Sequence, residues 1–251
     1  MVKSSADGNE EPVAFRANGF FLQCRLHMPE NDRPAFVVGS HGLFSNGDSP
    51  KQLALARACS GAGIAFFRFD HRGCGKSSGR FEQETDLPSR RRDLLSAVDT
   101  LLQRTDLASR FGLFGSSFGG AVCLSAAADA SASALVVNAA PVRSRTLGEA
   151  AVIESGPPHI DESFYREKLL FDVSAGLARL RAVLVFHGDR DRVVPVENAV
   201  EIYQQVGEPK KRIIFSGGDH LMSRRSHQIR FVRESTEWFR ALLSPPSGHG
   251  A

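Results

Sequence analysis

Long apolar runs are absent from this sequence of 251 residues, and none approaches the roughly 20 residues that a membrane-spanning helix needs. The N-terminal stretch MVKSSADGNEEP is polar and lacks the apolar centre of a secretory signal. An excess of one charge is also missing, because 31 basic residues face 28 acidic ones. A net charge of +3 gives no reason to expect a nucleic-acid or membrane partner. We therefore expect a cytoplasmic protein.

Cysteine and metal-ligand patterns are scarce as well. The four cysteines are Cys24, Cys59, Cys74 and Cys123, and no two of them have C-x-x-C spacing. We expect them to be buried free thiols in a reducing compartment. No pair of histidines with metal-ligand spacing stands near carboxylates, so we predict neither a metal nor a cofactor.

What the sequence does contain is a regular alternation of two patterns. Its 42% hydrophobic and 24% charged residues are ordinary for a globular protein, and its length suits one large α/β domain or two small ones. The short apolar runs are AFVVGS (35–40), IAFFRFD (64–70), FGLFG (111–115), ALVVNAA (134–140), AVLVFHG (182–188) and the further candidate KRIIFS (211–216). The segments with helical spacing are PKQLALARACSGAG, SRRRDLLSAVDTLLQR, GGAVCLSAAADA, ENAVEIYQQV and SHQIRFVRESTEWFRALL. Because continuous apolar runs are typical of parallel strands covered on both sides, the alternation predicts a single α/β domain with a mostly parallel, doubly wound sheet and helices on both faces.

Two finer patterns add to this prediction. From Leu22 to Met28 the residues alternate with period two, which indicates a half-solvated antiparallel strand near a sheet edge. Apolar residues of the second helical segment repeat at helical spacing, so we expect that face to be buried. They are Leu94, Leu95, Val98, Leu101 and Leu102.

We expect the folded domain to span residues 13–243, with flexible tails at 1–12 and 244–251, which are polar or rich in Pro and Gly. The segment 142–181 interrupts the strand–helix rhythm and is too long for a simple connection. It mixes the helix breakers SGPPH with apolar residues such as Phe164 and Tyr165. We interpret it as a small lid over a pocket, with a plain surface excursion as the alternative.

The stretch GLFGSSFGG contains a candidate nucleophile. Gly115-x-Ser117-x-Gly119 fits the G-x-S-x-G pattern, whereas Ser116 does not, because Phe114 stands where its first glycine belongs. A serine on a sharp strand-to-helix turn needs small neighbours two residues away on either side. The motif follows an apolar run and opens a helical one, as this geometry requires. The alternative is a glycine-rich turn that only packs a helix against the sheet.

A serine hydroxyl needs a base, and the base needs an acid that orients it. His220 lies in a loop after the last apolar run, and Asp189 and Asp191 follow the strand candidate before it. The order Ser117, Asp191, His220 is the one that G-x-S-x-G hydrolases use. Asp191 is the preferred acid, because Asp189 falls inside the turn that Gly188 opens, where aspartate commonly bonds its own backbone.

An oxyanion hole requires two rigid backbone N–H donors. Phe118, the residue after the nucleophile, is expected to supply one. The loop Ser40-His41-Gly42-Leu43 after the first apolar run is expected to supply the other, with Gly42 allowing a tight turn that leaves the Leu43 N–H free.

The segment DHRGCGKS (70–77) resembles two nucleotide-binding patterns but completes neither. A phosphate-binding P-loop needs glycine at position 70, where Asp70 stands. The dinucleotide fingerprint G-x-G-x-x-G fails at Ser78. We interpret the segment as a tight structural turn near the rim of the active site.

Together these motifs resemble the α/β-hydrolase superfamily. The HG loop at His41-Gly42 resembles its oxyanion loop, DHRGCGKS resembles its D-x-R-G-x-G-x-S turn, and HGDRDRVVP (187–195) resembles its H-G-x-x-D-x-x-V-P acid motif. The set is similar to the serine aminopeptidase S33-like and small-lid carboxylesterase branch, which includes feruloyl esterases. The family pattern also places its acid at the second aspartate, Asp191.

The sequence therefore predicts a serine hydrolase, with Ser117, Asp191 and His220 as catalytic residues and the N–H groups of Leu43 and Phe118 as oxyanion donors. A carboxylesterase acting on a small-molecule ester with a small or medium acyl group is the leading interpretation. A thioesterase, amidase or peptidase with the same triad remains open, because the triad is indifferent to the leaving group. So does a non-catalytic binding protein on the same fold.

Overall fold

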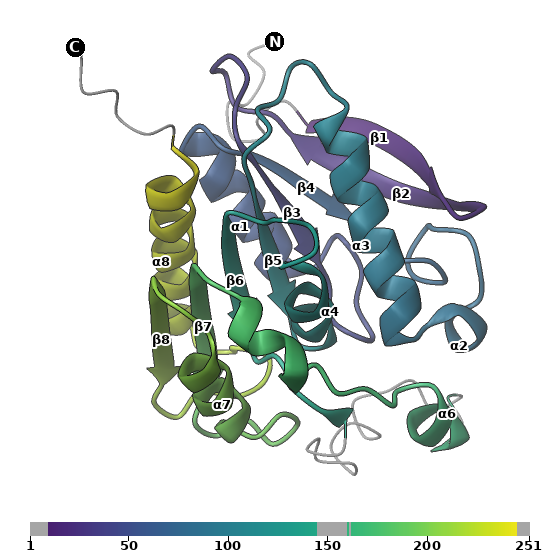
Figure 1. Ribbon diagram of the computed structural model, residues 1–251, viewed down its shortest axis with the longest axis vertical. Coiled ribbons are helices and arrows are strands. Elements are labelled where there is room, and N and C mark those ends of the chain that lie inside the picture. The colour runs from purple at the N-terminus through teal and green to yellow at the C-terminus, as the bar shows by residue number, and fades with distance from the viewer. Residues whose placement is uncertain (1–9, 145–159, 161, 245–251) are drawn as a thin grey trace.

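One mixed sheet organises the molecule, for which the computed structural model describes residues 10–144, 160 and 162–244 (Figure 1). Within these residues, eight strands join in the order β1-β2-β4-β3-β5-β6-β7-β8. The strands are β1 (Glu10–Ala17), β2 (Phe20–His27), β3 (Phe36–Ser40), β4 (Ala65–Phe69), β5 (Phe111–Ser116), β6 (Ala134–Asn138), β7 (Val183–Gly188) and β8 (Lys210–Phe215). From β4 through β3 to β8 every pairing is parallel, whereas β1 and β2 are antiparallel to their neighbours. The predicted single α/β domain is confirmed.

The antiparallel edge is one strand wider than the sequence predicted. The alternating run at 22–28 is β2, and β1 pairs outside it through a turn at Asn18 and Gly19, both with positive φ. β1 begins at Glu10, three residues before the expected start of the domain, because Glu10 lies opposite His27 in the ladder. The residues Glu-Glu-Pro have little strand propensity, and pairing with β2 overrides it.

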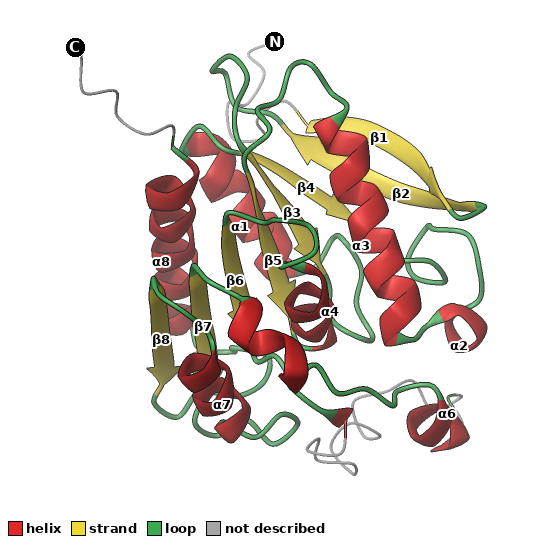
Figure 2. Cartoon of the chain, viewed as in Figure 1, coloured by secondary structure: helices red, strands yellow, loops and turns green. Residues whose placement is uncertain are grey.

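Helices cover both faces of the sheet, as expected (Figure 2). One face carries α1 (Pro50–Gly61) and α8 (Arg225–Leu243), and the other carries α3 (Leu87–Leu102), α4 (Phe118–Ala126), α7 (Glu197–Gln205) and the 3₁₀ helix η2 (Ser174–Arg179). Two short helices, α2 (Phe81–Glu84) and α6 (Glu162–Glu167), lie at the end of the molecule where β3 and β5 finish. Each face buries its own apolar core because the strands are buried on both sides.

The buried face of α3 differs from the predicted stripe. Leu94, Val98 and Leu101 are buried, but Leu102 is 42% exposed because it lies one residue past the stripe. Arg90 and Asp93 are fully buried on this face instead. The helix therefore presents charged groups as well as apolar ones to the interior.

The four cysteines are free and buried, as predicted. Burial raises the pKa of the Cys24 and Cys59 thiols to about 12. Among the described residues, no helix is long and apolar enough to span a membrane.

Candidate active site

Ser117 lies on a sharp turn between β5 and α4, at the carboxyl end of a central strand. Its φ of 54° and ψ of −126° are unusual for a residue with a side chain. The chain passes so closely here that a Cβ on Gly115 would stand 2.3 Å from the Gly119 carbonyl oxygen, and one on Gly119 would stand 2.2 Å from that of Ser40. The two glycines of the motif are therefore required by contact with neighbouring backbone.

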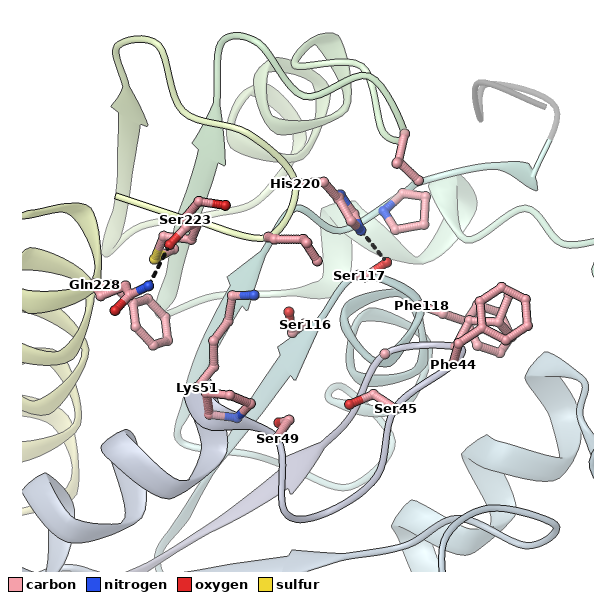
Figure 3. A pocket seen from close by; sticks show the side chains of 18 of the residues that line it. Phe44, Ser45, Ser49, Lys51, Ser116, Ser117, Phe118, His220, Ser223 and Gln228 are labelled. Atoms are coloured by element: carbon pink, nitrogen blue, oxygen red, sulfur yellow. Dashed lines mark hydrogen bonds between the residues drawn. The ribbon is translucent and has the colours of Figure 1, made fainter. Parts of the chain in front are cut away.

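His220 lies between Ser117 and Asp191, although the three residues come from loops after different strands. Its Nε2 is 3.0 Å from Ser117 Oγ, and its Nδ1 is 2.8 Å from Asp191 Oδ2 (Figure 3). A carboxylate beside Nδ1 favours the tautomer with the proton on that nitrogen, so Nε2 is free to accept the serine proton. Ser116 also lines the cavity, but its Oγ accepts a hydrogen bond from Asn138 Nδ2 at 3.4 Å and does not bond His220.

The two candidate acids, Asp189 and Asp191, make different contacts. Asp191 Oδ1 accepts the backbone N–H groups of Val193 and Val194 at 2.9 and 2.8 Å, which leaves Oδ2 facing His220. Asp189 instead accepts the Gly217 N–H at 2.6 Å and braces the loop that carries His220. Burial raises the pKa of Asp191, but hydrogen bonds from His187 and His220 outweigh it and hold the pKa well below its ordinary range.

The two expected oxyanion donors lie beside the nucleophile. Phe118 is the first residue of α4, so its N–H has no acceptor within the helix, and within the described residues the Leu43 N–H makes no hydrogen bond. Gly42 precedes a turn at Leu43 and Phe44, and its φ is not positive. A Cβ there would lie 3.6 Å from the Ser117 Cβ, so glycine keeps the space beside the serine open.

Arg90 holds the loop that carries Leu43, and sequence reasoning did not identify it. Its guanidinium donates to the carbonyl oxygens of His41, Gly42 and Leu43 at 3.4, 3.1 and 2.9 Å. It also lies 5.1 Å from the centre of the Phe118 ring. Since Arg90 precedes Leu94 by four residues, it belongs to the same helix face, and a charged residue at that position was the available signal.

The turn DHRGCGKS (70–77) also contacts the loop that follows β3. Asp70 accepts the backbone N–H groups of Gly47 and Lys76 at 2.7 and 2.8 Å. Arg72 bonds Asp93 through Nε at 2.8 Å and Nη2 at 2.6 Å, fixing the turn to α3. The predicted structural role of this turn agrees with these contacts.

A cavity of about 540 Å³ opens beside Ser117, within the size range of small-molecule sites. Leu43, Phe44, Phe118 and Phe231 give it a largely apolar wall. The described part of the segment 142–181 adds Leu169 and Phe171, while Phe164 is buried against Phe81 behind that wall. Residues 145–159 and 161 lie outside the described residues.

The arrangement at this edge of the sheet, a serine on a strand-to-helix turn beside a histidine and an aspartate, is that of the α/β-hydrolase fold. The family model of the serine aminopeptidases S33 matches residues 31–155. The uncharacterized protein YfhR of Salmonella typhimurium is 27% identical over 217 residues, which are 81% of this chain and 70% of the relative. The thiohydrolase aneE of Aspergillus aculeatus is 27% identical over 212 residues, covering 82% of this chain and 59% of the relative.

The fold is also similar to solved structures. Est1E of Butyrivibrio proteoclasticus, with bound ferulic acid, superposes with a TM-score of 0.78 at 21% identity, covering 93% of this chain and 100% of that one. This likeness concerns the fold. The chain belongs to the α/β-hydrolase superfamily.

Proposed function

We propose that this protein is a serine carboxylesterase that cleaves small or medium acyl esters. The observation that carries the proposal is the chain of contacts from Ser117 Oγ through His220 to Asp191, at 3.0 and 2.8 Å. The largely apolar cavity beside Ser117 supports a substrate with an acyl chain. Four buried free thiols support a reducing compartment, and we propose a cytoplasmic enzyme.

In the proposed mechanism, Ser117 Oγ bonds to the carbonyl carbon of the ester while His220 Nε2 takes the hydroxyl proton. The carbonyl oxygen becomes an oxyanion and accepts hydrogen bonds from the N–H groups of Leu43 and Phe118. When the bond to the alcohol breaks, His220 returns the proton to the leaving oxygen. Water then attacks the acyl-enzyme, with His220 as base again, and releases the acid and Ser117. Asp191 stabilises the charged imidazole throughout.

Labelling with a fluorophosphonate probe tests the proposal directly. We expect wild type and Ser116→Ala to be labelled and to hydrolyse p-nitrophenyl butyrate, and Ser117→Ala to do neither, with about 10⁶-fold lower kcat. Ser116 is a matched control because it is the adjacent residue with the same side chain. Labelling and hydrolysis by Ser117→Ala at the wild-type level would refute Ser117 as the nucleophile, whereas a wild type that is neither labelled nor active would favour a non-catalytic binding protein.

A thioesterase is the second candidate, because the similar protein aneE is a thiohydrolase. The same triad serves oxygen and sulfur leaving groups. Comparing kcat/KM for p-nitrophenyl butyrate with that for a butyryl thioester of the same acyl chain distinguishes the two. An aminoacyl anilide in the same panel tests for amidase or peptidase activity.

The segment 142–181 is proposed to act as a small lid. The supporting observation is that Leu169 and Phe171 line the cavity, with the Phe171 ring centre 5.5 Å from that of Phe118. These contacts would let the segment limit the length or shape of the acyl group that the cavity accepts.

A further inference from the structure

One lysine side chain stands out among the described residues that line the cavity beside Ser117. Among the described residues that line it, Lys51 is the one side chain with a full charge at neutral pH, since no Arg, Asp or Glu joins it in the wall. Figure 3 shows Lys51 reaching from the start of α1 with its amino nitrogen in the cavity, on the side where Ser116 lies. The remaining wall is mostly apolar residues and serines. A lone lysine in such a wall requires an explanation.

Among the described residues, the amino group of Lys51 has no hydrogen-bond or ion-pair partner. No hydrogen bond or ion pair joins its Nζ to another described residue, although the side chain is half-buried. Burial lowers the pKa of Lys51, and the charges of Asp219 and Asp191 oppose that shift. Both carboxylates are already bonded, Asp219 to the Ser223 N–H at 2.8 Å and Asp191 to His220. Neither compensates the charge of Lys51 by direct contact.

The position of Lys51 in its helix is also unfavourable for a cation. It is the second residue of α1, where the backbone N–H groups give the helix a positive end, and the first turn contains no acidic residue. A cation that is partly removed from water, without a partner among the described residues and next to a positive helix end destabilises the folded protein. An anion bound in the cavity would offset all three unfavourable effects.

We infer that this enzyme acts on esters that carry a carboxylate, and that Lys51 binds this group. The inference rests on the proposed function of Ser117. One lysine balances a single negative charge, whereas a phosphate dianion is usually held by several donors or an arginine fork. Ser45 and Ser49 line the same cavity, and the hydroxyl of Ser49 makes no helix-capping bond, so both can donate to a carboxylate oxygen. Lys51 is thus a specificity residue for the acidic end of the substrate.

Pairs of esters that differ in one charge test the inference. On the acyl side, the mono-p-nitrophenyl ester of glutaric acid is compared with p-nitrophenyl valerate. On the alcohol side, 4-butyryloxybenzoic acid is compared with its neutral analogue, methyl 4-butyryloxybenzoate. We expect Lys51→Met to lower the ratio of kcat/KM for the anionic to the neutral ester by about tenfold to a hundredfold in one of the two pairs, the range of a hydrogen bond to a charged group. The pair that responds identifies the end of the substrate that carries the carboxylate.

Arg57→Met is the matched control, because it removes a positive charge from the exposed side of the same helix. The ratio should be unchanged in this variant, and Lys51→Glu should lower it further than Lys51→Met. Equal ratios for wild type and Lys51→Met in both pairs would overturn the inference and leave the proposed esterase intact.

A binding measurement keeps the inference separate from the proposed function. If wild type hydrolyses no ester, the proposed function fails, and calorimetric titration of monoethyl glutarate into Ser117→Ala decides the inference. Binding that is lost when Lys51→Met is added supports a carboxylate site. No binding, or equal binding with and without Lys51, overturns it.

Discussion

The guanidinium of Arg90 donates a hydrogen bond to the carbonyl oxygen of Leu43 at 2.9 Å, the residue whose N–H we propose as an oxyanion donor. A second bond reaches the Gly42 carbonyl oxygen at 3.1 Å. In a trans peptide the carbonyl of Gly42 and the N–H of Leu43 point in opposite directions. By holding that carbonyl, Arg90 turns the Leu43 N–H away from itself. Arg90 is therefore a positioning residue for the oxyanion hole.

Arg90→Lys should lower kcat for p-nitrophenyl butyrate by about tenfold to a hundredfold with little change in KM, because lysine cannot hold three carbonyl groups at once. The loss should be smaller than the roughly 10²- to 10³-fold cost of deleting an oxyanion donor outright. Arg91→Lys is the control, since Arg91 lies on the same helix and bonds Ser125 and Asp129 at the surface. A rise in KM at unchanged kcat would contradict the positioning role.

Exchanging each aspartate of the HGDRD segment for asparagine tests the assignment of the acid. Asp191→Asn should reduce kcat by about 10⁴-fold, because an amide beside Nδ1 favours the wrong histidine tautomer. Asp189→Asn should cost far less, because Asp189 bonds the Gly217 N–H and does not touch His220. Circular dichroism verifies that both variants are folded. A larger kinetic loss in Asp189→Asn would reassign the acid.

The stability of the protein should fall as the pH is lowered from about 6.5 towards 4, the window between the ordinary pKa of histidine and that of buried His71. Burial lowers the pKa of His71 to about 4, although Asp93 opposes this shift. In this window the unfolded chain binds a proton that the folded chain does not, so acidification favours unfolding. The effect of one such group is at most about 1.4 kcal/mol per pH unit.

Urea unfolding of wild type and His71→Gln between pH 7 and 4.5 measures the contribution of His71 to the pH dependence of stability. The variant should show a shallower dependence of the free energy of unfolding on pH. Part of the dependence should persist, because burial also lowers the pKa of His41, whose Nε2 accepts the backbone N–H of His71 at 3.1 Å. Equal slopes for the two proteins would show that His71 does not contribute.

Phe171→Ala should shift the preference among p-nitrophenyl esters towards longer or bulkier acyl groups, because Phe171 lines the cavity wall. The ratio of kcat/KM for octanoate to that for acetate should rise several-fold. Leu170→Ala is the matched control, since Leu170 is 69% exposed and next in the chain. An unchanged ratio in Phe171→Ala would favour a surface excursion over a lid.

The predicted strands correspond to seven strands of the sheet because buried parallel strands leave continuous apolar runs in the sequence. The first strand was missed because Glu10 and Glu11 are held by pairing with β2, which composition does not report. The Asn18-Gly19 pair was a usable hairpin signal there. Chain order was enough to suggest Ser117, Asp191 and His220, since parallel strands end at one edge.

The buried charges could not be predicted in the same way. Arg90 lies in the run SRRRDLL, where its place on the apolar face of the helix is a signal, but its role follows only from contact with the His41–Leu43 loop. Lys51 likewise gives no signal in the sequence, because its significance depends on a cavity formed by six separate segments. Sequence order locates residues on strands and loops, and tertiary contact decides which charges are isolated.

The placement of the thiols has a consequence for measuring how the molecule opens. Cys24 and Cys123 lie in the core on the α3 and α4 side of the sheet, and Cys59 lies in the core on the α1 and α8 side. Because a buried thiol reacts with an alkylating reagent only after its surroundings open, the modification rate of each cysteine gives the opening free energy at its own location. Mass spectrometry of the alkylated peptides would thus compare the two layers of helices in one native sample. Equal rates at Cys59 and Cys123 would indicate global unfolding, whereas faster reaction at one of them would identify the layer that detaches first.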